Sequence, residues 1–194
     1  MVNGTETLLI RTHRASDIST ILRLTEEFNL RLSLSGVVEG WMVAEQIAAA
    51  DVPVIIDPIE NLPSSFETLG ARLDNAKLLS DAGVTLVFTG MSWLSTHNAY
   101  LVRQSAGNAV ANGLDKDVAI AAMTRNPAKL FAAPVSGDIA VGEIADLVLW
   151  SGDPLELTSE PDLVMIAGQQ VPLESRALLL RDRYFKRLQA MNAE

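Results

Sequence analysis

Chemically reactive side chains are scarce in this chain of 194 residues, which has two histidines and no cysteine. The lack of cysteine excludes disulfides, thiolate catalysis and thiolate metal sites. Any metal would therefore need ligands from His, Asp, Glu or backbone oxygen. The two histidines are His13 and His97, so the supply of strong metal ligands is small.

Arg11 and His13 lie two positions apart at the end of an apolar run, residues 8–13. On a strand their side chains would point the same way. His13 is expected either to contact a metal or substrate, or to act as a loop histidine hydrogen-bonded near the next helix. Arg11 is expected to hold either a salt bridge with a carboxylate or an anionic ligand.

The stretch VFTGMSWLSTHN, residues 87–98, leaves an apolar run and ends in hydroxyl, imidazole and amide groups without one carboxylate. No His–Asp relay accompanies its serines, which argues against a serine hydrolase. His97 is expected either to touch a ligand or to cap a loop. The candidate pocket consists of residues in or near the ends of the apolar runs: Arg11, His13, Ser35, Thr89, Ser92, His97 and Asn98.

Two aspartates have structural explanations that are favoured over catalysis. Asp57 ends the run 52–57 and precedes Pro58, which is typical of a turn-forming residue. Asp146 lies in IADLVLW, a pattern that indicates a hairpin. Neither is therefore assigned to the pocket.

The charge and hydropathy patterns exclude several classes of partner. The net charge is −9, which argues against nucleic-acid binding, because phosphate contacts need clustered cations. The basic segment RALLLRDRYFKR is typical of the solvated face of a helix. No apolar run approaches the roughly 20 residues that span a bilayer, and the start of the chain lacks secretory-signal features. We therefore expect a cytoplasmic protein that binds neither nucleic acid nor membranes.

Four short apolar runs, residues 8–13, 31–36, 52–57 and 84–89, alternate with helical patterns. Parallel strands need crossover connections, and helices supply them, so the alternation predicts an α/β fold with four parallel βα units. No Gly-rich phosphate loop follows any run, which argues against a nucleotide-binding fold.

Two further helix starts are predicted from capping patterns. Ser64 with Glu67 resembles a capping box, which predicts a helix that begins there and ends at Gly83. Asn126 followed by Pro127 predicts an N-cap and a first helical residue, and thus a new helix.

The pattern changes near Pro134. The segments GDIAVGEIADLVLWSGDP and DLVMIAGQQVP contain short apolar runs punctuated by Gly, Asp and Pro, which predicts antiparallel hairpins. A last helix is expected at about residues 174–190. We therefore divide the chain into βα units at 1–134, a small β appendage at 135–173 and a C-terminal helix at 174–194.

The phrase AMTRNPAKLFAAPVSGDIAVGEIADLVLWSGDPLE closely resembles the C-terminal signature of the metal-dependent amidohydrolase superfamily, in its imidazolonepropionase-like branch. Glu143 stands where that branch usually has Lys. HRASDI, NLPSSFETLGARLDNAKLL and AGNAVANGL also look like this branch, so the resemblance covers nearly the whole chain. The residues that match the signature are Thr124, Asn126, Pro127, Ala128, Gly137, Gly142, Ala145, Asp146, Leu147 and Val148.

The resemblance implies a TIM-type (β/α)8 barrel joined to a small β-sandwich. It further implies one or two divalent ions, such as zinc, manganese or iron, at the carboxyl ends of the strands. Such enzymes hydrolyse a non-peptide C–N bond in an amide, cyclic amide or dipeptide with metal-activated water, because a bound divalent ion lowers the pKa of water from about 15.7 toward 7. This chain resembles the second half of the barrel and a fragment of the sandwich, so the His-x-His of the first strand is missing.

Several positions depart from the pattern of metal ligands in the resembled family. Arg11 stands where a ligand His is often found, with His13 two positions later as the remaining candidate ligand. Ser35 lies in the neighbourhood of another ligand His. Gly90 and Met91 stand where an Asp is expected. One histidine cannot supply the roughly three protein ligands of a mononuclear site, so we expect no resident metal cofactor in this chain and a degenerate site.

An open sheet of four parallel strands leaves two edges, which normally invite pairing. We therefore expect a homo-oligomer such as a homodimer, or a missing N-terminal half. The resemblance implies a metal-dependent hydrolase, and the missing ligands lead us to expect that this chain alone is inactive. The alternative is a non-catalytic binding or assembly module on a degenerate hydrolase scaffold, with a small molecule as a compatible ligand.

Overall fold

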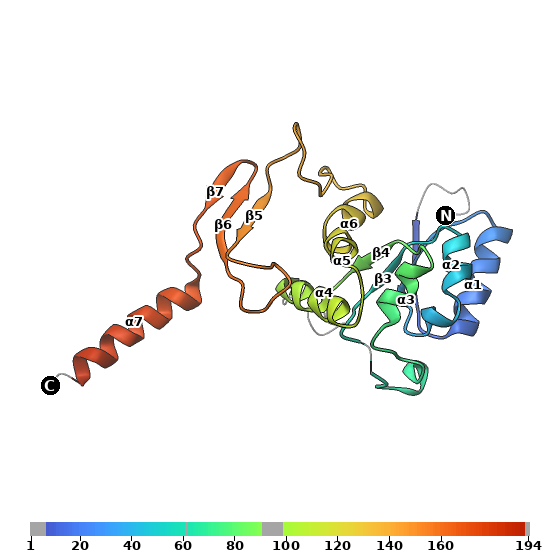
Figure 1. Ribbon diagram of the computed structural model, residues 1–194, viewed down its shortest axis with the longest axis horizontal. Helices are drawn as coiled ribbons and strands as arrows, with labels where there is room; N and C mark the ends of the chain where they lie inside the picture. The colour runs from blue at the N-terminus through green and yellow to red at the C-terminus, as the bar shows by residue number, and fades with distance from the viewer. Residues whose placement is uncertain (1–6, 61, 91–98, 193–194) are drawn as a thin grey trace. The chain divides into compact units, whose positions relative to one another are not determined.

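A computed structural model describes residues 7–60, 62–90 and 99–192 of the chain (Figure 1). The chain forms two compact units. The first is Met1–Glu143 with Leu155–Leu157, and the second is Ile144–Pro154 with Thr158–Glu194. No helix among the described residues is long and apolar enough to cross a membrane.

A parallel four-stranded sheet forms the centre of the first unit, as the alternation of apolar runs predicts. Its strands follow one another in the order β1-β2-β3-β4, and each neighbouring pair is parallel. β3 and β4 are shorter than their apolar runs, because the pairing covers only the middle of each. The strands are β1 (Thr7–Thr12), β2 (Arg31–Gly36), β3 (Val54–Ile56) and β4 (Leu86–Phe88).

Helices connect the strands and cover the sheet. The core lies between the strands and the first three α-helices, where Ile18, Ile47 and Leu79 are fully buried. α4, α5 and α6 pack against β4 (Figure 1). The helical segments are α1 (Ala15–Glu27), η1 (Gly40–Met42), α2 (Ala44–Ala49), η2 (Phe66–Thr68), α3 (Asn75–Asp81), η3 (Ala99–Leu101), α4 (Val102–Ala111), α5 (Lys116–Met123) and α6 (Arg125–Leu130).

The predicted start of the third helix at Ser64 is wrong. The capping box instead joins Ser65 and Thr68 and opens only the short η2, while α3 begins at Asn75. A contact distant in sequence helps to explain the interruption, because the Trp41 indole N–H donates to the carbonyl oxygen of Gly70 at 2.8 Å. That carbonyl is turned toward Trp41 rather than toward a helical partner. The helix ends near Gly83 as predicted.

The predicted cap at Asn126 is also wrong. α6 begins at Arg125 with Thr124 as its N-cap, so Pro127 is the third helical residue. A proline is tolerated there because the first-turn N–H groups have no intrahelical partner. The Asn126 side chain has a different role, since its Nδ2 donates to the Leu86 carbonyl oxygen of β4 at 2.8 Å. The Asn-Pro phrase therefore ties α6 to the sheet.

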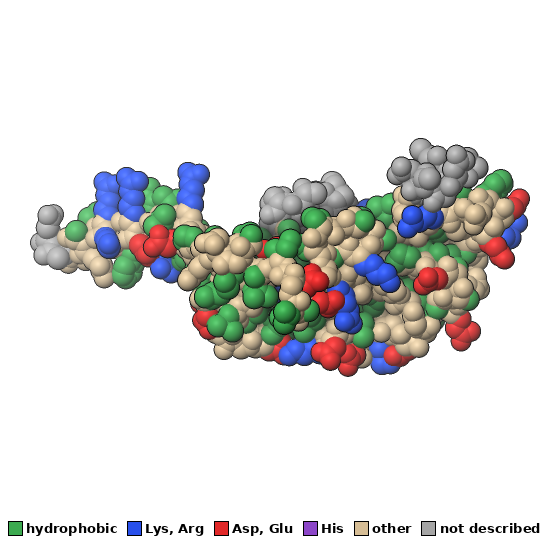
Figure 2. Space-filling view, turned by 90° about the horizontal axis from the view of Figure 1, so that it is seen from above, with side chains coloured by type: hydrophobic (Ala, Val, Ile, Leu, Met, Phe, Trp, Pro, Cys, Tyr) green, Lys and Arg blue, Asp and Glu red, His purple; other side chains and the backbone are tan. Residues whose placement is uncertain are grey.

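The second unit is a three-stranded antiparallel sheet followed by one helix. The strands β5 (Leu147–Trp150), β6 (Pro161–Ile166) and β7 (Gln169–Val171) lie in that order, which confirms the predicted antiparallel hairpins. α7 (Arg176–Met191) follows, with every described residue exposed. Figure 2 shows Lys and Arg side chains projecting along α7, as the sequence predicts for a solvated basic helix. In the part of the chain described, this single sheet does not establish the expected sandwich, which stays a prediction.

The segment between the two units begins as part of the first. Gly137 lies against the backbone of Arg125, where an added Cβ would be 2.6 Å from the amide nitrogen of that residue. Arg125 also faces Asp138, at 3.7 Å between Nη1 and Oδ1. These contacts hold the turn after Pro134 against α6, within the first unit, which extends to Glu143.

Candidate functional site

The carboxyl ends of the four strands surround a small open hollow. Arg11 is paired with Ser35 on the neighbouring strand, and Ser35 is paired with Ile55. Thr89 follows β4, where its amide donates to the Ile56 carbonyl oxygen at 3.0 Å. The residues that line this hollow of about 250 Å³ are Leu9, Arg11, Ser35, Gly36, Ile55, Asp57, Glu60 and Thr89. Three residues of the sequence-derived pocket, from three strands or strand ends, therefore lie around one hollow.

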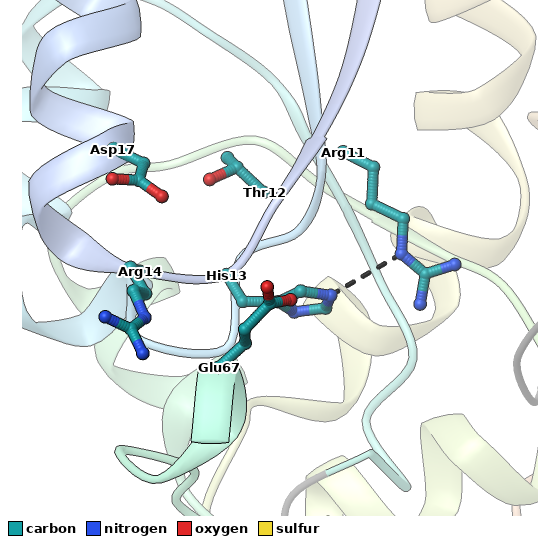
Figure 3. Close-up of a pocket in the computed structure, with 6 residues that line it drawn as sticks. All are labelled: Arg11, Thr12, His13, Arg14, Asp17 and Glu67. Atoms are coloured by element: carbon teal, nitrogen blue, oxygen red, sulfur yellow. Dashed lines mark hydrogen bonds between the residues drawn. The ribbon is translucent and has the colours of Figure 1, made fainter. Parts of the chain in front are cut away.

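A second hollow lies at the end of β1, and Arg11 lines both (Figure 3). The second hollow has a volume of about 490 Å³, which is within the range of small-molecule sites. Its walls carry both positive and negative side chains, drawn in Figure 3: Arg11, Thr12, His13, Arg14, Asp17 and Glu67. Arg11 is therefore the side chain common to both hollows.

Arg11 and His13 interact directly. The Nε–H of Arg11 donates to Nε2 of His13 at 3.5 Å, a long hydrogen bond (Figure 3). A ring nitrogen that accepts is unprotonated, so this bond places the proton of the neutral ring on Nδ1. Nδ1 is buried and has no partner among the described residues.

The His13 ring is held in its neutral form. Partial burial of the ring is the largest cause that lowers the pKa of His13 below its ordinary value of 6.5, and the positive charge of Arg11 lowers it further. The carboxylates of Glu60 and Glu67 oppose the shift without cancelling it. At neutral pH the positive charge of the pair is therefore on Arg11.

Gly36 makes room for the ring and was not recognised from the sequence. Its φ is +86°, in the left-handed region, and a Cβ there would lie only 2.6 Å from Cε1 of His13. The residue after Gly36 is bonded to the end of β1: the amide of Val37 donates to the Thr12 carbonyl oxygen at 2.7 Å. A glycine as the last residue of an apolar run was the only signal of this role.

Asp57 is a buried carboxylate that serves the fold. Its Oδ1 accepts from the amide of Ile59 at 3.1 Å, which is the predicted turn, and from the hydroxyl of Ser105 at 3.0 Å. Ser105 belongs to α4 and is fully buried. The carboxylate therefore joins the end of β3 to α4, a contact between residues 48 positions apart that the sequence did not reveal.

Residues 10–171 match the amidohydrolase family. The chain belongs to the amidohydrolase family. Its structure is similar to the crystal structure of an amidohydrolase from Thermotoga maritima MSB8, with a TM-score of 0.76 and 26% identity over 88% of this chain and 44% of that chain. The parallel sheet and its helices are accordingly consistent with part of an amidohydrolase TIM-type barrel.

A second solved structure, of an uncharacterized protein, shares the fold. It has a TM-score of 0.55 and 17% identity, and the match covers 88% of this chain and 56% of that one. No curated protein matches the chain. The chain thus spans about half the length of the solved structures that it matches.

The divalent metal that the amidohydrolase family implies does not fit the described side chains. Residues 7–60, 62–90 and 99–192 contain no group of three His, Asp or Glu side chains that could hold an ion. Nε2 of His13 faces the guanidinium of Arg11, whose charge would repel a cation at that nitrogen. One oxygen of Asp57 is already held by α4. The described side chains of this chain therefore offer no site for that metal.

The other three residues of the sequence-derived pocket are not described by the structure. Ser92, His97 and Asn98 lie outside the described residues, as does Met91. Asp146, which was assigned a structural role, accepts from the amide of Ala167 at 2.7 Å within the second unit. That bond confirms its place in a hairpin.

Proposed function

We propose that this chain forms one half of an amidohydrolase barrel of the imidazolonepropionase-like branch. Joined to a second half, it would take part in hydrolysis of a non-peptide C–N bond in an amide, cyclic amide or dipeptide. Alone, it would bind no divalent metal and hydrolyse nothing. The observation that carries this proposal is a set of four parallel βα units with a hollow of mixed polar and apolar lining at their carboxyl ends, among whose described residues no metal-binding group occurs.

The open sheet supports a need for a second half. β1 and β4 are the two ends of the strand order, so within residues 7–60, 62–90 and 99–192 each has one side without a neighbouring strand. Leu9 of β1 is 57% exposed although it lies within a strand. An exposed apolar strand at a sheet edge favours association with another polypeptide. The half length of the chain relative to the amidohydrolase from Thermotoga maritima MSB8 is in keeping with this.

In the complete site, the second half would have to supply whatever activates the attacking water. The residues of this chain would orient the substrate. Arg11 supplies a fixed positive charge, Ser35 and Thr89 supply hydroxyl groups on the same hollow, and neutral His13 holds Arg11 in place. Specificity in this type of barrel is determined by groups at the carboxyl ends of the strands.

A second candidate function is a non-catalytic binding module formed by self-association, most simply as a homodimer. The Arg11–His13 bond favours it, because the cation occupies the acceptor nitrogen that a metal would need. Two copies would bring two such pairs together and would add only this chain's own side chains to the site. A small ligand would then be bound without hydrolysis. For either candidate we propose that the protein acts in the cytoplasm.

Three measurements on the same preparation separate the candidates. Native mass spectrometry gives the number of chains, metal analysis of protein purified without chelators gives bound zinc, manganese or iron, and a panel of N-acyl amides, cyclic imides and dipeptides tests hydrolysis. The assays are repeated after co-expression with the polypeptide encoded immediately upstream. Metal and hydrolysis in the co-expressed complex alone would support the first candidate. A metal-free dimer that hydrolyses nothing in either preparation would support the second, and hydrolysis by the isolated chain would contradict both.

A further inference from the structure

We infer that the guanidinium of Arg11 binds the carboxylate of a small organic acid in the hollow at the carboxyl ends of β1–β4. The assignment of this acid as the substrate, rather than only as a ligand, depends on the proposed function. Binding itself is a property of this chain and can be measured without a second half or a metal.

The place of Arg11 in the sheet gives it access to both hollows. Its side chain is exposed, and it projects from the same face of β1 as Leu9. Within the described residues, no carboxylate lies within 4.0 Å of its nitrogens, although Asp57 and Glu60 line the same hollow. The salt bridge that the sequence suggested for Arg11 is thus not formed in the part of the chain described. Its charge is available to a ligand.

The hydrogen bond to His13 orients this charge. Arg11 donates to the ring through Nε, and the hydrogen bond drawn in Figure 3 leaves from that nitrogen and not from the two terminal nitrogens. Those two nitrogens form the fork that matches the two oxygens of a carboxylate. His13 is a positioning residue here: its ring is neutral, so it holds the guanidinium without repelling it. The ring lies so close to Gly36 that an added Cβ there would clash with it.

The other walls of the hollow define the rest of the ligand. Leu9 and Ile55 offer apolar surface, and Ser35 and Thr89 offer hydroxyl groups. The acidic residues Asp57 and Glu60 line the same hollow, so a ligand with two negative charges would be repelled more than one with a single charge. A monocarboxylate is therefore favoured over phosphate.

The volume of the hollow and its hydrogen-bonding groups further restrict the class of ligand. The hollow of about 250 Å³ is smaller than the roughly 300–1,000 Å³ of drug-sized ligand sites, so it suits a compact molecule. An amide N–H on the ligand could donate toward the acidic side of the hollow while its carboxylate meets Arg11. The ligand class is thus a small monocarboxylate that also carries an amide, as in an N-acyl amino acid.

The test measures binding of N-acetylglycine to the isolated chain by calorimetry or NMR titration at low ionic strength. N-acetylglycinamide is the neutral analogue, and inorganic phosphate is the dianionic one. The variants are Arg11→Gln and Arg11→Lys, each checked for folding by circular dichroism. Arg31→Gln is the matched control, because Arg31 is also exposed on the sheet but at the amino end of β2, away from the hollow.

We expect N-acetylglycine to bind at least about tenfold more tightly than either N-acetylglycinamide or phosphate, which corresponds to about 1.4 kcal/mol. Arg11→Gln should lose about tenfold in affinity, Arg11→Lys should lose less, and Arg31→Gln should match the wild type. The inference is overturned if N-acetylglycine does not bind the folded wild type, if the neutral analogue binds equally, or if Arg11→Gln retains the affinity. An equal loss in Arg31→Gln would also overturn it, since the attraction would then be unspecific.

The outcome is independent of the test of the proposed function. If the co-expressed complex hydrolyses neutral amides as fast as carboxylates and the isolated chain binds neither, the function stands and the inference fails. If the isolated chain binds N-acetylglycine through Arg11 and the complex hydrolyses nothing, the inference stands and the hydrolase proposal fails.

Discussion

Replacing Gly36 by alanine should be more costly than replacing a glycine of similar backbone conformation elsewhere. A Cβ at this position would lie 2.6 Å from Cε1 and 3.0 Å from Nδ1 of His13, and 3.2 Å from the carbonyl oxygen of Thr12. Gly83 is the matched control, because its φ of +90° is nearly the same and no heavy atom lies within 4 Å of the added Cβ. The difference in unfolding free energy between Gly36→Ala and Gly83→Ala therefore measures the steric clash of the added Cβ with its neighbours.

The expected magnitudes follow from this comparison. Positive φ costs an L-residue about 1–2 kcal/mol, so Gly83→Ala should lose about that much free energy of unfolding. Gly36→Ala should lose about 1–3 kcal/mol more, because a close-packed site must shift to accept the methyl group. The His13 ring is only half-buried and can move, so the extra cost should fall toward the lower end.

Urea unfolding followed by tryptophan fluorescence at pH 7 measures both losses. NMR titration of the ring gives a second readout: displacement of the ring toward water should raise the pKa of His13 toward 6.5. The variant His13→Ala in the Gly36→Ala background should recover the crowding cost, since the clashing ring is gone. If Gly36→Ala and Gly83→Ala lose the same free energy, and His13→Ala recovers none of it, the proposed packing of the ring on Gly36 is refuted.

Three other predictions concern stability. Because the folded-state pKa of His13 lies below 6.5, the unfolded chain binds more protons than the folded chain as the pH falls through 6.5. The wild type should therefore lose more free energy of unfolding between about pH 7 and 5 than His13→Gln. Equal slopes of unfolding free energy against pH in urea melts would contradict this. Ser105→Ala removes a buried donor to the Asp57 carboxylate and should cost about 1.5–3 kcal/mol in urea unfolding, whereas an unchanged midpoint would show that the bond contributes nothing. Asn126→Ala and Asn126→Asp both remove the donor to the Leu86 carbonyl and should each lose about 1–2 kcal/mol of unfolding free energy; wild-type stability in Asn126→Asp would exclude the bond.

The strands were predictable because their signal is local. Each apolar run is short and bounded by polar or Gly residues, and parallel pairing follows from the helices between the runs. β2 has the bounds of its run, residues 31–36, as the structure shows. The antiparallel hairpins of the second unit were recognised in the same way, from the Gly and Asp residues that punctuate them.

Helix starts were less predictable, because distant residues decide them. The helix start predicted at Ser64 was wrong. The Trp41 indole N–H donates to the Gly70 carbonyl oxygen, a contact between residues 29 positions apart that a local pattern does not reveal. α1 offers a second case. Its N-cap residue makes no side-chain bond, and the carboxylate of Glu39 accepts instead from the Ala15 amide at 3.0 Å. A capping pattern within a few residues cannot indicate such a partner.

In the candidate site, too, local features were predictable from the sequence and contacts between distant segments were not. The spacing of Arg11 and His13 was enough to predict a shared face, because residues two apart on a strand project together. What each does there depends on neighbours from other segments: Gly36 under the ring, and Ser105 on the nearby Asp57. The bond between Arg11 and His13 leaves no trace in the sequence beyond this spacing.

The strand order has a consequence for how the first unit is made. Because β1, β2, β3 and β4 are neighbours in the order in which they leave the ribosome, each new strand finds its partner already present. Assembly can thus proceed one βα unit at a time during synthesis, with short loop closures at every step. The growing edge is always the newest strand. Among the described strands none pairs with the outer edge of β1, so that edge stays open while the other three strands are added.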